Sequence, residues 1–138
     1  MITVYTDGSC LKNPNGPGGW AFLVLGLEKK WEVSGGNPST TNNRMELEAV
    51  IQTLEFLSNS KDNIHIYTDS KYVINGITEW IHNWIRKNWK NVKNPDLWKK
   101  LYKLNHSKVE WKWVKGHSGN IYNDRVDKLA KIEAEYFN

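Results

Sequence analysis

The stretch ITVYTDGS, residues 2–9, has a close counterpart in IHIYTDSK, residues 64–71. Both runs are rich in β-branched and aromatic residues with a two-residue alternation, which is typical of β-strands, and both contain Tyr-Thr-Asp at their end. Because side chains alternate between the two faces of a strand, the tyrosine and the aspartate of each run share one face. Asp7 and Asp69 therefore hold equivalent places at the carboxyl ends of two predicted strands.

If the two strands are parallel neighbours about 4.8 Å apart, Asp7 and Asp69 converge at the crevice where open α/β sheets commonly bind ligands. Two carboxylates this close repel each other, so either one is protonated or a divalent cation lies between them. Each aspartate also has a simpler interpretation. Asp69 could cap the helix that follows, and Asp7 could stabilise a turn at Gly8.

Periodicity along the chain predicts an α/β fold. Strands are predicted at residues 2–6, 20–25, 31–34, 64–68 and 109–114. The run NPNGPGG, residues 13–19, is predicted to be a turn-rich loop because proline and glycine at that density do not hold a regular element. Helices are predicted directly after PSTTNN, residues 38–43, with an apolar stripe from Leu47 to Leu57, then from near Ser70, and over 79–87, 95–105 and 123–137. Three early strands followed by alternating strands and helices indicate a mixed sheet, antiparallel at one side and parallel beyond.

Two further carboxylates border the apolar faces of predicted helices. Glu46 directly precedes Leu47, the first residue of one apolar stripe, and Asp127 precedes Ala130 by three positions. The inner face of that last helix is predicted to consist of Val126, Leu129, Ala130, Ala134 and Phe137. The simpler interpretations are a capping pair of Asn43 with Glu46, and for Asp127 an acid in an early helical turn, favourable to the helix dipole. Four acids in such places are hard to attribute to chance.

Charge is distributed unevenly along the 138 residues, whose net charge is +4. Residues 86–115 hold ten Lys or Arg against two acids, a balance of +8, and the rest of the chain carries nine positives and thirteen negatives, or −4. Six of the eight tryptophans lie in or near this segment: Trp80, Trp84, Trp89, Trp98, Trp111 and Trp113. Basic charge interleaved with aromatic surface suits a polyanion. The alternative is a set of core tryptophans under a solvated lysine face.

Several classes of protein find no support in the sequence. Cys10 is the single cysteine, so an internal disulfide is excluded and a structural zinc site is not indicated. No run of about 18 apolar residues and no charged-then-apolar leader occurs, so we expect a cytoplasmic protein without a membrane segment. The length fits one domain, and no G-x-G-x-x-G follows a strand, which argues against dinucleotide binding.

Four motifs together resemble the ribonuclease H type 1 family. They are DGS at residues 7–9, TTNNRMELEA at 40–49, YTDS at 67–70 and GHSGNIYNDRVDKLA at 116–130. They cover nearly the whole chain in the right order, and TNNRMEL is highly specific. The resemblance implies a ribonuclease H-like five-stranded mixed sheet in the order 3-2-1-4-5, with the first three strands antiparallel and helices on its flanks. It also implies that residues 1–138 form a single catalytic domain.

The implied activity is endonucleolytic hydrolysis of the RNA strand of RNA–DNA hybrids, nearly independent of sequence, leaving 5′-phosphate and 3′-hydroxyl ends. The family's metal ligands fall on Asp7, Glu46, Asp69 and Asp127, which would hold two Mg²⁺ ions about 3.5 to 4 Å apart, with Mn²⁺ as a substitute. By this resemblance one ion activates the attacking water and the other stabilises the departing 3′-oxygen. Asp7 is the expected bridging ligand and Asp127 the least tightly fixed one. His117, in GHSG, matches the family's mobile histidine for proton transfer or product release, although a lone histidine is usually structural.

Substrate contacts are implied on both strands. The RNA strand would be lined by the Gly8 main chain, Cys10, Asn13, Asn43 and Glu46, and a DNA phosphate would be held by Thr41, Asn42 and Asn94, with Trp80 packed on deoxyribose. Ordinary loop and cap chemistry is the alternative for these residues. The run WIHNWIRKNWK, residues 80–90, resembles the family's basic protrusion, expected here around residues 80–98, and its link to Pro95 is short for the family. We expect a monomer whose partner is the hybrid duplex, without a separate hybrid-binding domain.

Two rival functions remain at this point. A non-catalytic nucleic-acid-binding module would keep the fold and the basic face, and the loss of one acidic ligand would favour it, but all four positions are filled. A transposase or junction resolvase of the same superfold is the nearer rival. Such nucleases are not expected to carry TNNRMEL together with the basic, tryptophan-rich segment.

Overall fold

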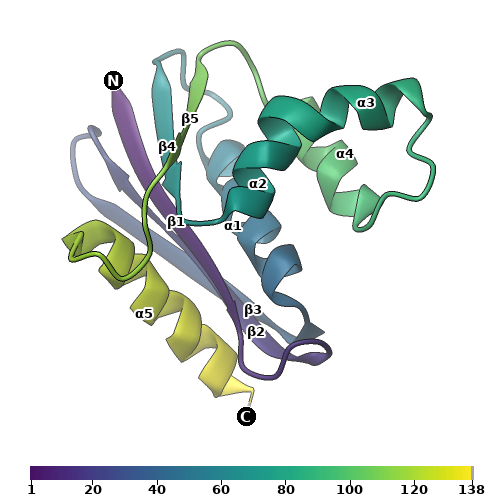
Figure 1. The fold of residues 1–138 in the computed structure, drawn as a ribbon. Coiled ribbons are helices and arrows are strands. Elements are labelled where there is room, and N and C mark those ends of the chain that lie inside the picture. The colour runs from purple at the N-terminus through teal and green to yellow at the C-terminus, as the bar shows by residue number, and fades with distance from the viewer. Residues whose placement is uncertain (138) are drawn as a thin grey trace.

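The computed structural model describes residues 1–137 and consists of one sheet with helices on both of its faces (Figure 1). The strands are β1 (Ile2–Cys10), β2 (Gly16–Leu25), β3 (Trp31–Thr40), β4 (Ile64–Thr68) and β5 (Val109–Trp113). The helices are α1 (Asn42–Phe56), α2 (Lys71–Asn75), the π-helical turn η1 (Gly76–Trp80), α3 (Ile81–Arg86), α4 (Pro95–Leu104) and α5 (Ile121–Tyr136). All five predicted strands and all predicted helical regions are present.

The strand order is β3-β2-β1-β4-β5, which confirms the predicted order 3-2-1-4-5. β1 pairs antiparallel with β2 and parallel with β4, and β5 pairs parallel with β4. In the register of β1 and β4, Tyr5 lies opposite Tyr67 and their rings stack with centroids 4.9 Å apart. Because Asp7 and Asp69 each follow these tyrosines by two positions, the register carries both aspartates to the same level of the sheet.

The first three strands are longer than predicted, and the prediction of a loop over the whole of residues 13–19 is wrong. β1 continues through Gly8 to Cys10, β2 already begins at Gly16, and β3 extends to Thr40. The glycines here mark close approaches of backbone rather than turns. A Cβ on Gly19 would overlap the carbonyl oxygen of Ala130, so the absence of a side chain lets α5 lie directly on β2.

α1 and α5 pack on opposite faces of the sheet (Figure 1). The predicted stripe of α1 is buried, and on α5 the residues Val126, Ala130 and Ala134 are fully buried as predicted. Leu129 is only half-buried, and the predicted burial of Phe137 is wrong because its side chain is 40% exposed. Phe137 follows the last residue of α5 and lies over Gly36 of the edge strand β3, where the sheet covers only part of the ring.

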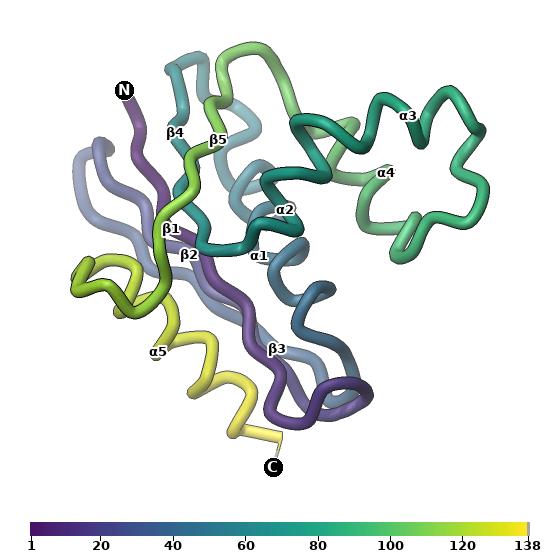
Figure 2. The backbone as a smooth tube through the Cα atoms, viewed as in Figure 1, coloured from purple at the N-terminus to yellow at the C-terminus, as the bar shows by residue number. Residues whose placement is uncertain are grey.

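α2, η1, α3 and α4 lie to one side of the sheet, and the loop that joins α3 to α4 extends furthest from it (Figure 2). Among the tryptophans of this region, some lie in the core and others form exposed aromatic surface, so each predicted alternative holds for part of them. Trp98 of α4 is fully buried in the core, whereas Trp80 and Trp113 are 41% and 46% exposed. No helix within residues 1–137 has the length and apolar character that crossing a bilayer requires.

Candidate active site

Asp7, Glu46 and Asp69 meet in one place. Each contributes a carboxylate oxygen, and these oxygens all lie within 4.8 Å of one another. Asp7 lies within β1 and is 3% exposed, Asp69 directly follows β4, and Glu46 comes from the second turn of α1. The convergence predicted from the two strand ends is therefore present, and a helix supplies the third acid.

The N-cap of α1 excludes the simpler interpretation of Glu46. Thr41 is the N-cap, and its Oγ1 accepts a hydrogen bond from the Arg44 amide at 3.2 Å. Asn43 lies inside the helix, so a capping pair of Asn43 with Glu46 does not form. Glu46 is thus free to face β1.

Asp69 and Asp7 are not explained by local structure either. The cap of α2 is Ser70, whose Oγ accepts from the Val73 amide at 3.2 Å, so Asp69 is not the cap. No turn follows Asp7, because β1 runs straight through Gly8. A Cβ on Gly8 would overlap the backbone of Met45 and Glu46, so the glycine is needed for the close contact with α1.

Asp127 lies outside this group of three but near it. The structure places it in the second turn of α5, which begins at Ile121 after the N-cap Asn120, and the first-turn acid is Asp124. The Asp127 carboxylate forms an ion pair with Lys131 at 3.1 Å. The influence of Asp127 is nevertheless among those that raise the pKa of Asp7, after the larger effects of burial and the charge of Asp69.

The carboxylates of Asp7, Glu46 and Asp69 lack enough nearby positive charge to balance three negative charges. Burial, followed by the charge of Asp69, raises the pKa of Asp7 to about 9. Burial and the charges of Asp7 and Asp69 raise the pKa of Glu46 well above its ordinary value, and burial also raises the pKa of Asp69. The Oε1 atom of Glu46 is buried without a hydrogen-bond partner within residues 1–137. An all-oxygen donor set with an orphaned acceptor fits a hard divalent cation such as Mg²⁺ or Mn²⁺.

His117 stands beside the carboxylates on the loop between β5 and α5. It is exposed and has a positive φ of 55°. A Cβ on the preceding Gly116 would lie 2.7 Å from Oδ2 of Asp69, so this loop rests against that carboxylate. The charge of His117 is one of the influences that lower the pKa of Asp69, against the larger effect of burial. The imidazole therefore lies within electrostatic reach of the site.

The residues predicted to line the RNA strand gather where α1 begins. Asn13 Oδ1 accepts a hydrogen bond from the Asn42 amide at 3.1 Å. Cys10 Sγ lies 3.5 Å from the carbonyl oxygens of Gly16 and Thr40, and Asn43 is exposed. These contacts bring the Cys10 region of β1 next to the Asn42 end of α1, adjacent to Gly8 and Glu46.

The residues predicted to hold a DNA phosphate are joined through Arg44, a residue that the sequence interpretation did not single out. The Arg44 amide binds Thr41, and Nη1 of Arg44 donates to Oδ1 of Asn94 at 3.2 Å. Asp96 accepts from both terminal nitrogens of Arg44, at 3.1 and 2.7 Å. The position of Arg44 within TNNRMEL was the only signal in the sequence that could have pointed to it.

Tyr72 is a second residue that the sequence interpretation missed. Its hydroxyl accepts hydrogen bonds from Asn94 Nδ2 at 3.1 Å and from Trp98 Nε1 at 3.0 Å. Its ring meets that of Trp80 edge-on, with centroids 6.4 Å apart. Tyr72 therefore lies between the predicted phosphate ligand and the predicted deoxyribose contact.

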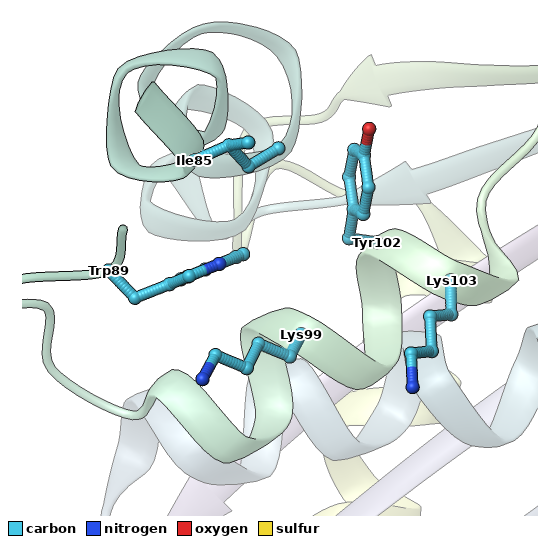
Figure 3. A pocket seen from close by; sticks show the side chains of 5 residues that line it. All are labelled: Ile85, Trp89, Lys99, Tyr102 and Lys103. Carbon is cyan, nitrogen blue, oxygen red and sulfur yellow. The ribbon is translucent and has the colours of Figure 1, made fainter. Parts of the chain in front are cut away.

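A separate cleft of about 250 Å³ lies between α3 and α4 (Figure 3). It is lined by Ile85, Trp89, Lys99, Tyr102 and Lys103. Figure 3 shows Lys99, Tyr102 and Lys103 on α4; the Tyr102 ring stands across from Ile85 and Trp89, and the amine ends of both lysines point the other way. None of the predicted site residues lines this cleft, so the cleft is separate from the carboxylates of Asp7, Glu46 and Asp69.

Comparison with known proteins gives the same family at three levels. The RNase H family model matches residues 1–135. Ribonuclease HI of Caulobacter vibrioides is 51% identical over 94% of this chain and 89% of that protein. The crystal structure of LC9-RNase H1 superposes with a TM-score of 0.85 and 32% identity, over 99% of this chain and 73% of the other.

A second structure, LC11-RNase H1 in complex with an RNA/DNA hybrid, shares the fold with a TM-score of 0.70 at 23% identity, over 99% of this chain and 98% of that chain. The resemblance first indicated by four short motifs is thus confirmed over nearly the full length. The chain belongs to the RNase H family.

Proposed function

We propose that this protein is an endonuclease that hydrolyses the RNA strand of RNA–DNA hybrids, largely without regard to sequence, and leaves 5′-phosphate and 3′-hydroxyl ends. The observation that carries the proposal is the convergence of Asp7, Glu46 and Asp69 within 4.8 Å in a chain of the RNase H family. A solved relative of the same fold is complexed with an RNA/DNA hybrid.

Asp7, Glu46, Asp69 and Asp127 would hold the divalent cations, with Asp7 as the ligand shared between two ions. Mg²⁺ is the proposed metal and Mn²⁺ a substitute; when bound, these ions supply Lewis-acid activation of water and of the phosphate. The orphaned Oε1 of Glu46 supports this assignment. Asp127 must exchange its ion pair with Lys131 for the cation, which makes it the weakest ligand of the four.

His117 would move protons at the edge of this centre. Its imidazole is exposed and follows Gly116, which rests against Asp69, so the ring would stand between the carboxylates and solvent. An imidazole titrates near neutral pH and is suited to accept or donate a proton there. The exposed side chain can also withdraw as the product leaves.

The remaining predicted residues would position the duplex. Gly8, Cys10, Asn13, Asn43 and Glu46 would face the RNA strand, where the 2′-hydroxyl distinguishes RNA from DNA. Thr41, Asn42, Asn94 and Trp80 would hold the DNA strand. These groups contact sugar and phosphate, which fixes orientation without reading bases.

Residues around 80–98 would form a basic protrusion that holds the duplex beyond the site of cleavage. The exposed Trp80 and the outward extension of the α3–α4 loop support this role. We further propose that the chain acts as a monomer and as a single catalytic domain, since all four proposed ligands come from one sheet and the helices packed on it.

The test compares an end-labelled RNA–DNA hybrid with double-stranded RNA and double-stranded DNA, each with Mg²⁺ and with chelator. Cleavage confined to the hybrid with metal supports the proposal. Asp7→Asn and Asp69→Asn should abolish cleavage while the hybrid still binds, and Asp124→Asn, an acid of the first turn of α5, is the matched control that should retain activity. Hybrid binding without cleavage by the unaltered protein would instead support a non-catalytic binding module.

A further inference from the structure

The hydroxyl of Tyr72 has a hydrogen-bonding arrangement that leaves its own proton unused. Its two neighbours are Asn94 Nδ2 at 3.1 Å and Trp98 Nε1 at 3.0 Å. An indole N–H can only donate, so the bond from Trp98 uses one lone pair of the Tyr72 oxygen. Whether the second contact uses the other lone pair depends on the orientation of the Asn94 amide.

Arg44 determines that orientation. A guanidinium has donors and no acceptor, so the Asn94 atom that faces Arg44 Nη1 at 3.2 Å must be the carbonyl oxygen. The amide nitrogen then faces Tyr72 and donates to it. Arg44 is itself held by two bonds to the Asp96 carboxylate, at 3.1 and 2.7 Å, and these bonds lower the pKa of Asp96, which keeps it ionised.

Tyr72 consequently accepts two hydrogen bonds, and its O–H must donate to a third group. No acceptor for this proton is present within residues 1–137, and Tyr72 is only partly buried. The Tyr72 hydroxyl is thus left with one donor that has no protein acceptor within residues 1–137, next to Asn94, whose amide also keeps a second N–H.

The side chain of Asn94 does not cap the helix that it precedes. Asn94 is the N-cap residue of α4, yet its side chain makes no capping bond, and its φ of 56° lies in the left-handed region. An asparagine at this position usually caps its own helix. Here the amide turns instead toward Arg44 and Tyr72.

We propose that the Tyr72 hydroxyl donates a hydrogen bond to the DNA phosphate held by Asn94, and that Arg44 and Asp96 are positioning residues that orient both donors. This inference rests on the proposed function, because it adds a contact to the DNA strand of the hybrid. An ionised phosphate oxygen is the strong acceptor that two converging neutral donors suit. The contact carries no base information, in keeping with cleavage that is independent of sequence.

The test combines Tyr72→Phe with hybrids whose DNA strand carries a single uncharged methylphosphonate, moved one phosphate at a time. Tyr72→Phe should raise KM for the unmodified hybrid about tenfold with kcat changed less than twofold, the cost of one hydrogen bond to a charged group. A methylphosphonate at the contacted phosphate should weaken the unaltered enzyme to a similar extent. When the methylphosphonate replaces the contacted phosphate, and at no other position, Tyr72→Phe should cause no further rise in KM.

Losses that do not add at one phosphate distinguish a direct contact of the Tyr72 hydroxyl from a purely structural role. Tyr72→Phe also leaves Asn94 and Trp98 without their acceptor, so a lower Tm is expected whatever the role of the hydroxyl. A purely structural role would make the two losses multiply at every phosphate, and that outcome overturns the proposal, as does an unchanged KM. Tyr136→Phe, which removes the hydroxyl of an 81% exposed tyrosine on α5, is the matched control and should leave KM unchanged.

The positioning role of Arg44 has its own readout. Arg44→Lys keeps the charge but loses the two-pronged bond to Asp96 and the defined partner of Asn94, so KM should rise in the same phosphate-dependent way. A loss that is equal for all methylphosphonate positions would overturn that assignment. Failure of the unaltered enzyme to cleave an unmodified hybrid would reject the proposed function itself and is observed separately.

Discussion

The backbone of Gly8 in β1 lies directly against the backbone of Glu46 in α1, because Gly8 has no side chain to separate the strand from the helix. This contact brings the carboxylate of Glu46 to those of Asp7 and Asp69. A methyl group at Gly8 would overlap the Met45 and Glu46 main chain and push α1 away from the strand.

We therefore expect Gly8→Ala to reduce kcat more than tenfold while lowering the free energy of unfolding by about 1 to 3 kcal/mol. Steady-state cleavage and urea unfolding measure the two effects. Ser9→Ala, one residue further along β1, is the control and should change neither appreciably. Full activity in a folded Gly8→Ala protein would show that Glu46 does not need this contact.

Replacing Asp7 by asparagine should abolish cleavage and yet stabilise the metal-free protein. The pKa of Asp7 is raised by burial and by the charge of Asp69, so ionised Asp7 is unfavourable in the folded state near pH 7. We expect Asp7→Asn to raise the free energy of unfolding by about 1 to 3 kcal/mol at pH 7 without metal. Calorimetry with chelator measures this, and a lower Tm for the variant would contradict it.

Stability without divalent cations should fall as pH rises. The pKa of Asp7 is about 9 in the folded protein against 3.8 ordinarily, so the folded state keeps a proton that the unfolded chain releases. The stabilising protonated form is fully present below about pH 4 in both states, and its contribution is lost as pH rises toward about 9. Urea midpoints across this range should decline less in Asp7→Asn than in the unaltered protein. An equal slope in both proteins would remove Asp7 as the cause.

His117→Ala should slow turnover by about 100-fold, a smaller loss than that of the carboxylate variants. The imidazole is exposed and beside Asp69 without being part of the carboxylate group, so its loss leaves the metal ligands in place. Single-turnover and multiple-turnover rates distinguish proton transfer from product release. Ser118→Ala in the same loop is the control, and a loss equal to that of Asp7→Asn would make the histidine obligatory.

Lys131→Ala should lower the Mg²⁺ concentration needed for half-maximal cleavage by about threefold. The lysine forms an ion pair with Asp127 at 3.1 Å and competes with a cation for that carboxylate. Lys128→Ala, an exposed lysine on the same helix, is the matched control and should leave the Mg²⁺ dependence unchanged. A higher Mg²⁺ requirement would show that Lys131 positions Asp127 instead of competing for it.

The sequence was most informative where local periodicity and long-range placement coincide. Strand alternation put Asp7 and Asp69 on equivalent positions, and the parallel register of β1 with β4 brings them together. The apolar stripe of α1 put Glu46 beside the sheet. The strand order itself came from the resemblance, since alternation within a strand contains no information about which strand lies next to it.

What could not be predicted depends on tertiary contacts. The glycines of residues 16–19 indicated a loop, because the sequence does not show that α5 lies against Gly19. The link from Arg44 through Asn94 to Tyr72 joins side chains from the starts of three helices, with no spacing that signals it. The roles of these residues, and of the four carboxylates, stay predictions that the variants above test.

Asp7 and Asp69 stand 62 positions apart in the chain, and only the pairing of β1 with β4 and the seating of α1 unite them with Glu46. An incompletely folded molecule therefore carries the same acids but has no centre able to cut a nucleic acid. The centre is therefore a property of the folded chain alone, because only the paired strands and the seated helix hold the acids together.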